Sequence, residues 1–300
     1  MTTLVALADP SQPIGVFDSG VGGLTVLGAL HAELPHERFI YLGDTARLPY
    51  GTKSAATVVR YALQAADALV ARGVKALVVA CNTASAVALP SMHERYGDLP
   101  VIGVVEPGAQ AAVMATRGGG IAVIGTEATV RGGAYQQAIA RRRPDARVSA
   151  VACQVFVALA EEGWTHGAVV RATAQRYLAP LFAAEAARRH CGLDEPVPAA
   201  AADTLVLGCT HFPMLRPVIR EVVGDEVAIV DSATTTACAT RALLRARGLL
   251  GSDDAAPPAP PPQPAVASFL ATDGAARFAA IGGRFLGREI AAHEVELIDL

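Results

Sequence analysis

Residues 77–83 read LVVACNT, a short apolar run that leads through one small residue to a cysteine and two polar side chains. The same arrangement returns at residues 205–211, which read LVLGCTH. An apolar run of this length is typical of a strand that is buried on both faces of a parallel sheet. The repetition indicates an internal duplication, in which two halves of the chain each carry a cysteine at the end of a strand.

Further apolar runs extend this pattern along the chain. Together with the two above, the predicted strands span 14–17, 39–42, 76–80, 101–105, 121–124, 205–207 and 227–230. Ala-rich stretches of helical character lie between them, at 54–72, 128–143, 166–190 and 234–247. Strands that alternate with helices predict an α/β fold with parallel sheets, whose ligands bind beyond the carboxyl ends of the strands. Glu106-Pro107-Gly108 follows one strand and is predicted to be a crossing segment or hinge.

Composition excludes several classes of protein. The 300 residues are 52% hydrophobic and 18% charged, which allows a sizeable core. The net charge of −3 provides no basic excess for nucleic acid. The first residues, MTTLVALADPSQP, lack the features of a signal peptide, and no run approaches the roughly 20 apolar residues of a membrane span. We therefore expect a cytoplasmic protein with neither nucleic acid nor membrane as a partner.

The five cysteines are an odd number without a C-x-x-C pair, which argues against a disulfide framework and a zinc knuckle. Histidines and carboxylates do not cluster with ligand spacing, so no metal is expected. Cys153, Cys191 and Cys238 are interpreted as small core residues. Residues 255–265, AAPPAPPPQPA, are predicted to form a surface linker without chemistry.

Cys81 and Cys209 are the candidate reactive thiols. Each follows a strand and precedes a predicted helix, whose dipole is expected to lower the pKa of a thiol at its start. Thr83 is a candidate cap for the first of these helices, and His211 is placed to take a proton from Cys209. The alternative for each cysteine is a buried core residue.

Asp18 ends the first strand and opens the loop Asp-Ser-Gly-Val-Gly-Gly. The loop lacks the spacing of a dinucleotide or phosphate loop, so a nucleotide-binding enzyme is disfavoured. Asp18 is interpreted as an acid/base partner or as a group that meets an ammonium ion, with capping of a helix near Gly22–Leu24 as the alternative. The other strand ends supply neutral donors suited to a small zwitterion: Ser19, Tyr50, Gly51, Asn82, Thr83, Thr126, Thr129 and Thr210.

These groups suit proton transfer at the Cα of an amino acid. Racemisation needs a base on one face and an acid on the other, and many racemases use pyridoxal phosphate held by a lysine. The chain has only two lysines, Lys53, which is at best a distant candidate, and Lys75, which lies at the wrong end of a strand. One thiolate and one thiol offer the same chemistry without a cofactor.

The order of these motifs resembles the glutamate racemases. The matching blocks begin at Asp18, Gly43, Ala80, Gly125 and Leu207, in the expected order, and the tail beyond residue 232 matches more loosely. The resemblance implies two pseudosymmetric α/β domains with the active site between them. We expect residues 1–105 and 216–300 in the first domain and 106–215 in the second.

The resemblance also implies roles for individual residues. Cys81 would be the base for D-glutamate and Cys209 the base for L-glutamate, assisted by Asp18 and His211. Glu161 falls at a further catalytic position, although two prolines of the family's preceding run are replaced here. The implied substrate-binding residues are Asp18, Ser19, Pro49, Tyr50, Gly51, Asn82, Thr83, Thr126, Thr129, Thr210 and His211.

The sequence thus predicts a cofactor-independent isomerase that interconverts L- and D-glutamate and supplies D-glutamate for peptidoglycan. The partner is the small substrate, and a homodimer is left open. One alternative is a racemase of aspartate or a related amino acid. Another is an inert ligand-binding or regulatory module, which is disfavoured because both cysteines and both assisting groups are present.

Overall fold

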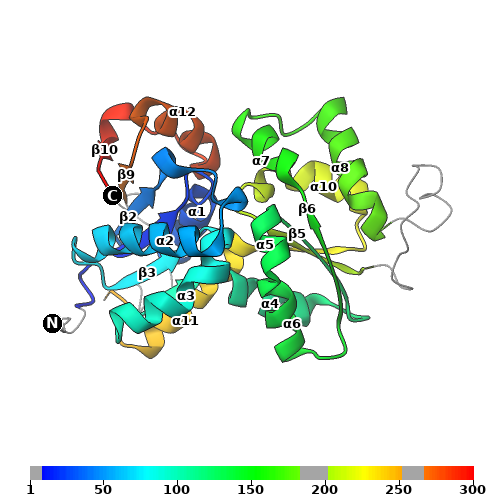
Figure 1. Ribbon diagram of the computed structural model, residues 1–300, viewed down its shortest axis with the longest axis horizontal. Helices are drawn as coiled ribbons and strands as arrows, with labels where there is room; N and C mark the ends of the chain where they lie inside the picture. The colour runs from blue at the N-terminus through cyan, green and yellow to red at the C-terminus, as the bar shows by residue number, and fades with distance from the viewer. Residues whose placement is uncertain (1–8, 183–201, 252–266) are drawn as a thin grey trace. The chain divides into compact units, whose positions relative to one another are not determined.

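The computed structural model describes residues 9–182, 202–251 and 267–300. The chain forms two compact units, residues 1–104 with 233–300 and residues 105–232. Figure 1 shows that the first unit contains both the blue beginning and the red end of the chain. The predicted linker at 255–265 and Cys191 lie outside the described residues.

The first unit has a six-stranded parallel sheet in the order β10-β9-β2-β1-β3-β4. Its strands are β1 (Ile14–Asp18), β2 (Phe39–Gly43), β3 (Ala76–Val79), β4 (Val101–Gly103), β9 (Ala267–Ala271) and β10 (Val295–Leu297). Its helices are α1 (Leu24–Glu33), α2 (Ala55–Val70), α3 (Asn82–Tyr96), α11 (Ser232–Ala246) and α12 (Ala275–Leu286), with short 3-10 turns η1 (Thr45–Arg47), η2 (Tyr50–Thr52) and η4 (Ala292–Glu294).

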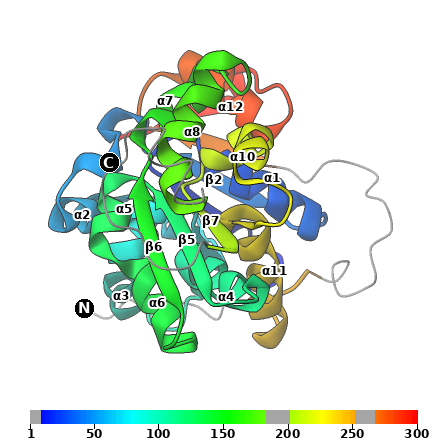
Figure 2. The same cartoon turned by 90° about the vertical axis from the view of Figure 1, so that its right-hand side faces the viewer.

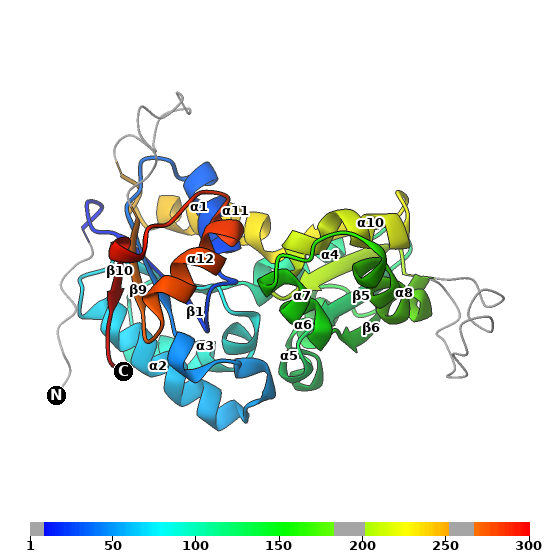
Figure 3. The same cartoon turned by 90° about the horizontal axis from the view of Figure 1, so that it is seen from above.

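Alternation along the strands divides the core of this unit into two layers. Phe17, Leu77 and Val79 pack with α2 and α3 in one hydrophobic cluster. The intervening residues of the same strands point to the opposite face, because successive side chains of a strand alternate. Figure 3 shows α2 and α3 on one side of the sheet and α1 and α12 on the other. The strands are therefore apolar on both faces, as a covered parallel sheet requires.

The second unit has a four-stranded parallel sheet in the order β6-β5-β7-β8, of which Figure 2 shows β6, β5 and β7 side by side. Its strands are β5 (Gly120–Gly125), β6 (Arg147–Ala152), β7 (Thr204–Gly208) and β8 (Ala228–Asp231). Its helices are α4 (Val105–Ala115), α5 (Glu127–Gly132), α6 (Ala134–Arg142), α7 (Gln154–Glu161), α8 (Ala168–Phe182) and α10 (Arg216–Val223), with the 3-10 turn η3 (Phe212–Leu215).

In each unit the first strand lies between the second and the third, so the order of the strands reverses at that point. The order β2-β1-β3-β4 in the first unit is repeated as β6-β5-β7-β8 in the second. Such a reversal leaves a crevice at the carboxyl ends of the two strands that flank it, where doubly wound sheets bind ligands. The two reversals lie at the carboxyl ends of β1 and β3 and at the carboxyl ends of β5 and β7. Cys81 and Cys209 follow β3 and β7, so they occupy equivalent positions.

The seven predicted strands are confirmed to within two residues at either end. Three other predictions are wrong. Residues 106–108 are not a hinge but lie in the first turn of α4, where proline is tolerated because its missing N–H has no helical partner. The helix predicted over 128–143 is divided into α5 and α6 by Gly133, whose φ is 68°. Residues 216–232 belong to the second unit rather than the first, because β8 pairs with β7.

Candidate active site

Cys81 lies at the reversal of strand order in the first unit. It occupies the N-cap position of α3, two residues beyond the end of β3, and only 5% of it is exposed. Phe17 of β1 pairs with Val79 of β3, so Ser19 and Cys81, two residues further along each chain, stand opposite one another. The Cys81 thiol donates a hydrogen bond to the Ser19 hydroxyl over 3.5 Å. The predicted proximity of these two residues is thus seen in the structure.

The electrostatics at Cys81 differ from the sequence expectation. Burial, together with the nearby Asp18 carboxylate, raises the pKa of the Cys81 thiol to about 12. Hydrogen bonds to Ser19 and to the backbone of Ala84 act in the opposite direction but are weaker. The prediction of a lowered pKa at the start of the helix was wrong, because desolvation of a buried thiolate outweighs the helix dipole. In the free protein Cys81 is therefore a protonated thiol at neutral pH.

Asp18 is fully buried at the end of β1, and its Oδ2 accepts a hydrogen bond from the Gly20 N–H over 3.0 Å. Helix α1 begins at Leu24 with Gly23 at the N-cap, so the capping role considered for Asp18 was wrong. A Cβ on Gly23 would lie 2.5 Å from the Asp18 Cβ. The loop therefore needs glycine at this position, because any larger residue would displace the carboxylate.

Asn82 and Thr83 lie in the first turn of α3, and both are buried. Thr83 does not cap the helix, because Cys81 occupies the N-cap position. The first turn of a helix has main-chain N–H groups without a partner in their own helix, and this end of a helix favours anionic groups. Asn82 and Thr83 thus lie where the sequence placed them, next to Cys81, although the predicted cap is corrected.

The turn formed by Pro49, Tyr50 and Gly51 is held by a carboxylate that the sequence analysis did not assign. Pro49 precedes η2, and Tyr50 and Gly51 form its first residues, with both of them buried. The Tyr50 hydroxyl donates a hydrogen bond to Oδ2 of Asp44, which is itself fully buried. The hydroxyl of Tyr50 is therefore engaged by the protein.

In the second unit, three predicted residues form one chain of contacts. The Cys209 Sγ lies 3.7 Å from His211 Nδ1, and His211 Nε2 lies 3.1 Å from Glu161 Oε1. Thr210 Oγ1 is also 3.4 Å from His211 Nδ1. Glu161 comes from the end of α7, so replacement of the family's two prolines has not removed its carboxylate from His211. If His211 accepted a proton from Cys209 at Nδ1, the Glu161 carboxylate at Nε2 would stabilise the positive charge of the imidazolium.

Thr126 and Thr129 lie at the end of β5, beside β7. Thr126 is the N-cap of α5 and accepts a hydrogen bond from the Thr129 N–H, and the two hydroxyls are 3.0 Å apart. Gly125 pairs with Gly208, so Thr126 stands opposite Cys209 in the next position along the two strands. Ser19 bears the same relation to Cys81 in the first unit. Each thiol is therefore accompanied by a hydroxyl at the equivalent position of the neighbouring strand.

The other cysteines divide between buried and exposed. Cys153 is fully buried at the start of α7, as predicted, and burial raises the pKa of its thiol. Cys238 lies on α11 but is exposed, so its interpretation as a core residue was wrong.

Within residues 9–182, 202–251 and 267–300, no three histidines, cysteines or carboxylates are grouped to hold a metal ion. No helix in the described part of the chain has both the length and the apolar character needed to cross a bilayer.

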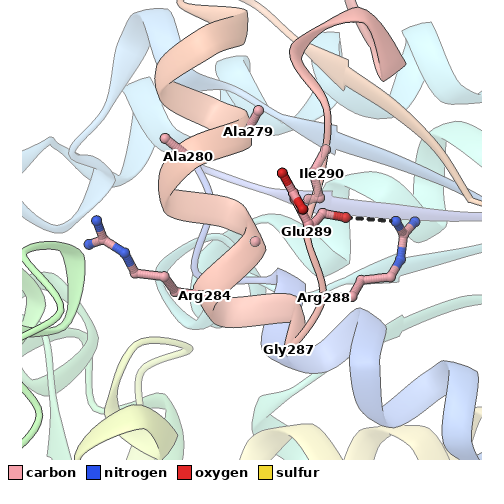
Figure 4. Close-up of a pocket in the computed structure, with 8 residues that line it drawn as sticks. Ala279, Ala280, Arg284, Gly287, Arg288, Glu289 and Ile290 are labelled. Atoms are coloured by element: carbon pink, nitrogen blue, oxygen red, sulfur yellow. Dashed lines mark hydrogen bonds between the residues drawn. The ribbon is translucent and has the colours of Figure 1, made fainter.

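A surface cavity of about 500 Å³ lies at the end of α12. Figure 4 shows Arg284 and Arg288 directed away from each other on its two sides. The Arg288 guanidinium donates to the main-chain oxygen of Glu289 over 3.0 Å. None of the predicted site residues is among the described residues that line this cavity.

Two parallel sheets that each present a thiol, a hydroxyl and an acid/base group define a class of proton-transfer enzyme. A model of the Asp/Glu/Hydantoin racemase family matches residues 25–240, and the chain belongs to this family. A glutamate racemase of Geobacter metallireducens is 48% identical over 281 residues, which cover 94% of this chain and 95% of that protein.

Solved structures agree with this similarity. The glutamate racemase of Thermus thermophilus, crystallised with beta-chloro-D-alanine, is 42% identical, with a TM-score of 0.79 over 97% of this chain and 98% of that one. The glutamate racemase of Francisella tularensis, in complex with D-glutamate, is 33% identical, with a TM-score of 0.80 and the same shares covered. The α/β fold predicted from the sequence is confirmed, and both of these structures are of glutamate racemases.

Proposed function

We propose that the chain is a glutamate racemase, which interconverts L- and D-glutamate by proton transfer between two thiols and the Cα of the substrate. The observation that carries the proposal is the equivalence of Cys81 and Cys209. Each follows the strand that is third in its unit in chain order, at the point where the strand order reverses. Each also has a hydroxyl and an acid/base group beside it. The names of the relatives support glutamate as the substrate.

The chemistry needs two groups that differ in protonation. The Cα–H of an amino acid is a very weak acid, so a base must remove this proton while an acid delivers another to the opposite face. A thiolate is a stronger nucleophile and base than its thiol, and it returns to the thiol form when it has taken the proton. After one turnover the two cysteines have exchanged protonation states, and the reverse reaction begins from that arrangement.

Cys209 is proposed as the base for L-glutamate. When His211 donates its Nε2–H to the Glu161 carboxylate, its Nδ1 carries a lone pair that faces the Cys209 thiol. The imidazole can then take the thiol proton, and the carboxylate stabilises the imidazolium that results. Glu161 therefore orients His211 and supports its charge.

Cys81 is proposed as the acid in the same direction and as the base for D-glutamate. With the pKa of its thiol raised to about 12, Cys81 carries the proton that the carbanion must receive. In the reverse direction it must become a thiolate. The ammonium group of a bound substrate would offset the Asp18 carboxylate, so substrate binding lowers the pKa of the Cys81 thiol from its value in the free protein.

Neutral donors are proposed to hold the substrate and to stabilise the charge that develops on its α-carboxylate. They are Ser19, Asn82, Thr83, Thr126, Thr129 and Thr210, with the turn of Pro49, Tyr50 and Gly51. A Schiff base is disfavoured, because Lys75 is buried with its ammonium 2.5 Å from Glu37 and 2.6 Å from the Pro10 carbonyl. The product is proposed to serve peptidoglycan synthesis, and the proposed location is the cytosol.

The test is incubation of the protein with L-glutamate in D₂O, with optical rotation and Cα deuterium followed together. We expect rotation to decay to zero while the first D-glutamate formed carries deuterium, because its proton comes from a second thiol that has exchanged with solvent. L-glutamate recovered early should still carry its original proton. D-glutamate that retains the original proton would contradict the two-thiol proposal. Turnover of L-aspartate with no turnover of L-glutamate would contradict the substrate.

A further inference from the structure

Asp44 is a fully buried carboxylate that connects three distant parts of the first unit. It follows β2 directly. Its oxygens accept from Arg47 Nε at 3.0 and 2.7 Å and from the Tyr50 hydroxyl. The Arg47 guanidinium is itself held by Gln64 of α2 at 2.6 Å and lies 4.3 Å from the centre of the Tyr61 ring. The charge of Asp44 is thus balanced by a cation that is fixed from α2.

The remaining donor to Asp44 comes from the far end of the chain. Thr272 follows β9, which pairs with β2 through Gly43 and Ala271, so Thr272 and Asp44 occupy the next positions along neighbouring strands. The Thr272 hydroxyl donates to Asp44 Oδ1 over 2.9 Å and accepts from the Ala46 N–H over 2.8 Å. One hydroxyl therefore holds both the carboxylate and the main chain of η1.

A second pair of hydrogen bonds strengthens this connection. The Thr45 hydroxyl donates to the Asp273 carbonyl over 2.6 Å and accepts from the Asp273 N–H over 2.9 Å. The segment from Asp44 to Arg47 is therefore attached to residues 272 and 273 by four side-chain hydrogen bonds. The same segment leads within a few residues into the turn that contains Tyr50.

We propose that Thr272 is a positioning residue for substrate binding, acting through Asp44 and the Tyr50 hydroxyl on the turn formed by Pro49, Tyr50 and Gly51. This inference rests on the proposed function, in which that turn contacts the substrate. Tyr50 is buried and its hydroxyl has Asp44 as its partner, so the location of Asp44 sets the location of the η2 main chain. Loss of the Thr272 hydroxyl leaves Asp44 and the Ala46 N–H each without one partner.

The expected effect is on binding rather than on proton transfer. Thr272→Val keeps the volume of the side chain but removes its hydroxyl. We expect KM for glutamate to rise on the order of tenfold in both directions, with kcat within about threefold of the native value, because the thiols and their assisting groups are unchanged. The primary deuterium isotope effect of each direction should stay as it is in the native enzyme. Thr272→Ser restores the hydroxyl and should restore KM.

Thr240→Val is the matched control. Thr240 is a buried threonine of the same unit, and its hydroxyl donates to the Thr236 carbonyl within α11 over 2.8 Å. Its replacement removes one buried hydroxyl without touching Asp44, so KM should stay within about twofold. If Thr272→Val does not fold, Tyr50→Phe breaks the same connection from its other end, and the same rise in KM is expected.

The experiment measures kcat and KM for both enantiomers in the native protein and in these variants, with thermal unfolding beside them. A rise in KM for Thr272→Val that is reversed in Thr272→Ser and absent from Thr240→Val supports the inference. An unchanged KM in Thr272→Val, or in Tyr50→Phe where that variant replaces it, overturns the inference while the native activity stands. Absence of glutamate turnover by the native protein overturns the proposed function and this inference with it.

Discussion

Glu161→Gln tests the part that the carboxylate plays behind His211. The substitution keeps an oxygen that can accept from His211 Nε2, now at 3.1 Å, but removes the negative charge. Two unit charges about 4 Å apart interact by about 4 kcal/mol at an effective dielectric constant of about 20. The Glu161 side chain is 22% exposed, and solvent screening reduces this to about 1 to 2 kcal/mol. The rate of the step that needs the imidazolium should fall about 5- to 30-fold.

The assay is kcat/KM for each enantiomer, combined with primary isotope effects. Because the two enantiomers are equal in free energy, kcat/KM must fall by the same factor in both directions. The isotope effect with 2-deuterated L-glutamate should rise more than that with the D-enantiomer, since Cys209 is the base for the L-form. Glu162→Gln removes an exposed charge from the neighbouring position and should change nothing. If Glu161→Gln stays within twofold of native, the proposed role of Glu161 is wrong.

Three further predictions concern pH, stability and reactivity. Burial, with Arg288 nearby, lowers the pKa of His31 from 6.5 to about 4, so the unfolded chain binds a proton at a higher pH than the folded protein does. Up to about 3 kcal/mol of stability should therefore be lost as the pH falls from 6.5 to 4. Denaturant unfolding of His31→Leu should show a weaker dependence on pH over this range. Lys75→Met leaves a buried carboxylate unpaired and should lower the free energy of unfolding by about 3 to 5 kcal/mol, measured by urea titration, with KM unchanged. Glutamate should slow alkylation of Cys81 and Cys209 but not of exposed Cys238, and mass spectrometry showing equal protection of all three would contradict the assignment.

The strands and both thiols could be predicted because their signal is local. Each run of apolar residues that is buried on both faces is continuous in sequence, and Cys81 and Cys209 follow such runs directly. The strand β9 was missed because ASFLA at residues 267–271 is short and partly polar. The assignment of β8 to the wrong domain has a related cause, since pairing with β7 is a tertiary choice that its own residues do not reveal.

The part of the site that could not be predicted depends on burial and on contacts between distant residues. Asp44 and Thr272 are 228 residues apart in sequence, so nothing near either of them indicates their hydrogen bond. The predicted direction of the pKa shift at Cys81 was wrong because that shift also depends on residues distant in sequence. A helix start is visible in sequence, whereas the desolvation that outweighs it arises only when β1, β3 and α3 enclose the thiol.

The most direct test of the two-thiol account uses a glutamate analogue that loses a leaving group from its β-carbon once the Cα proton has been removed. Elimination needs only the base, so it reports each thiol separately. The account predicts that Cys81→Ser slows elimination from the D-analogue more and that Cys209→Ser slows elimination from the L-analogue more, while both variants lose racemisation by about 10² to 10⁴-fold. Loss of elimination from the same enantiomer in both variants, or near-native racemisation by Cys209→Ala, would contradict it.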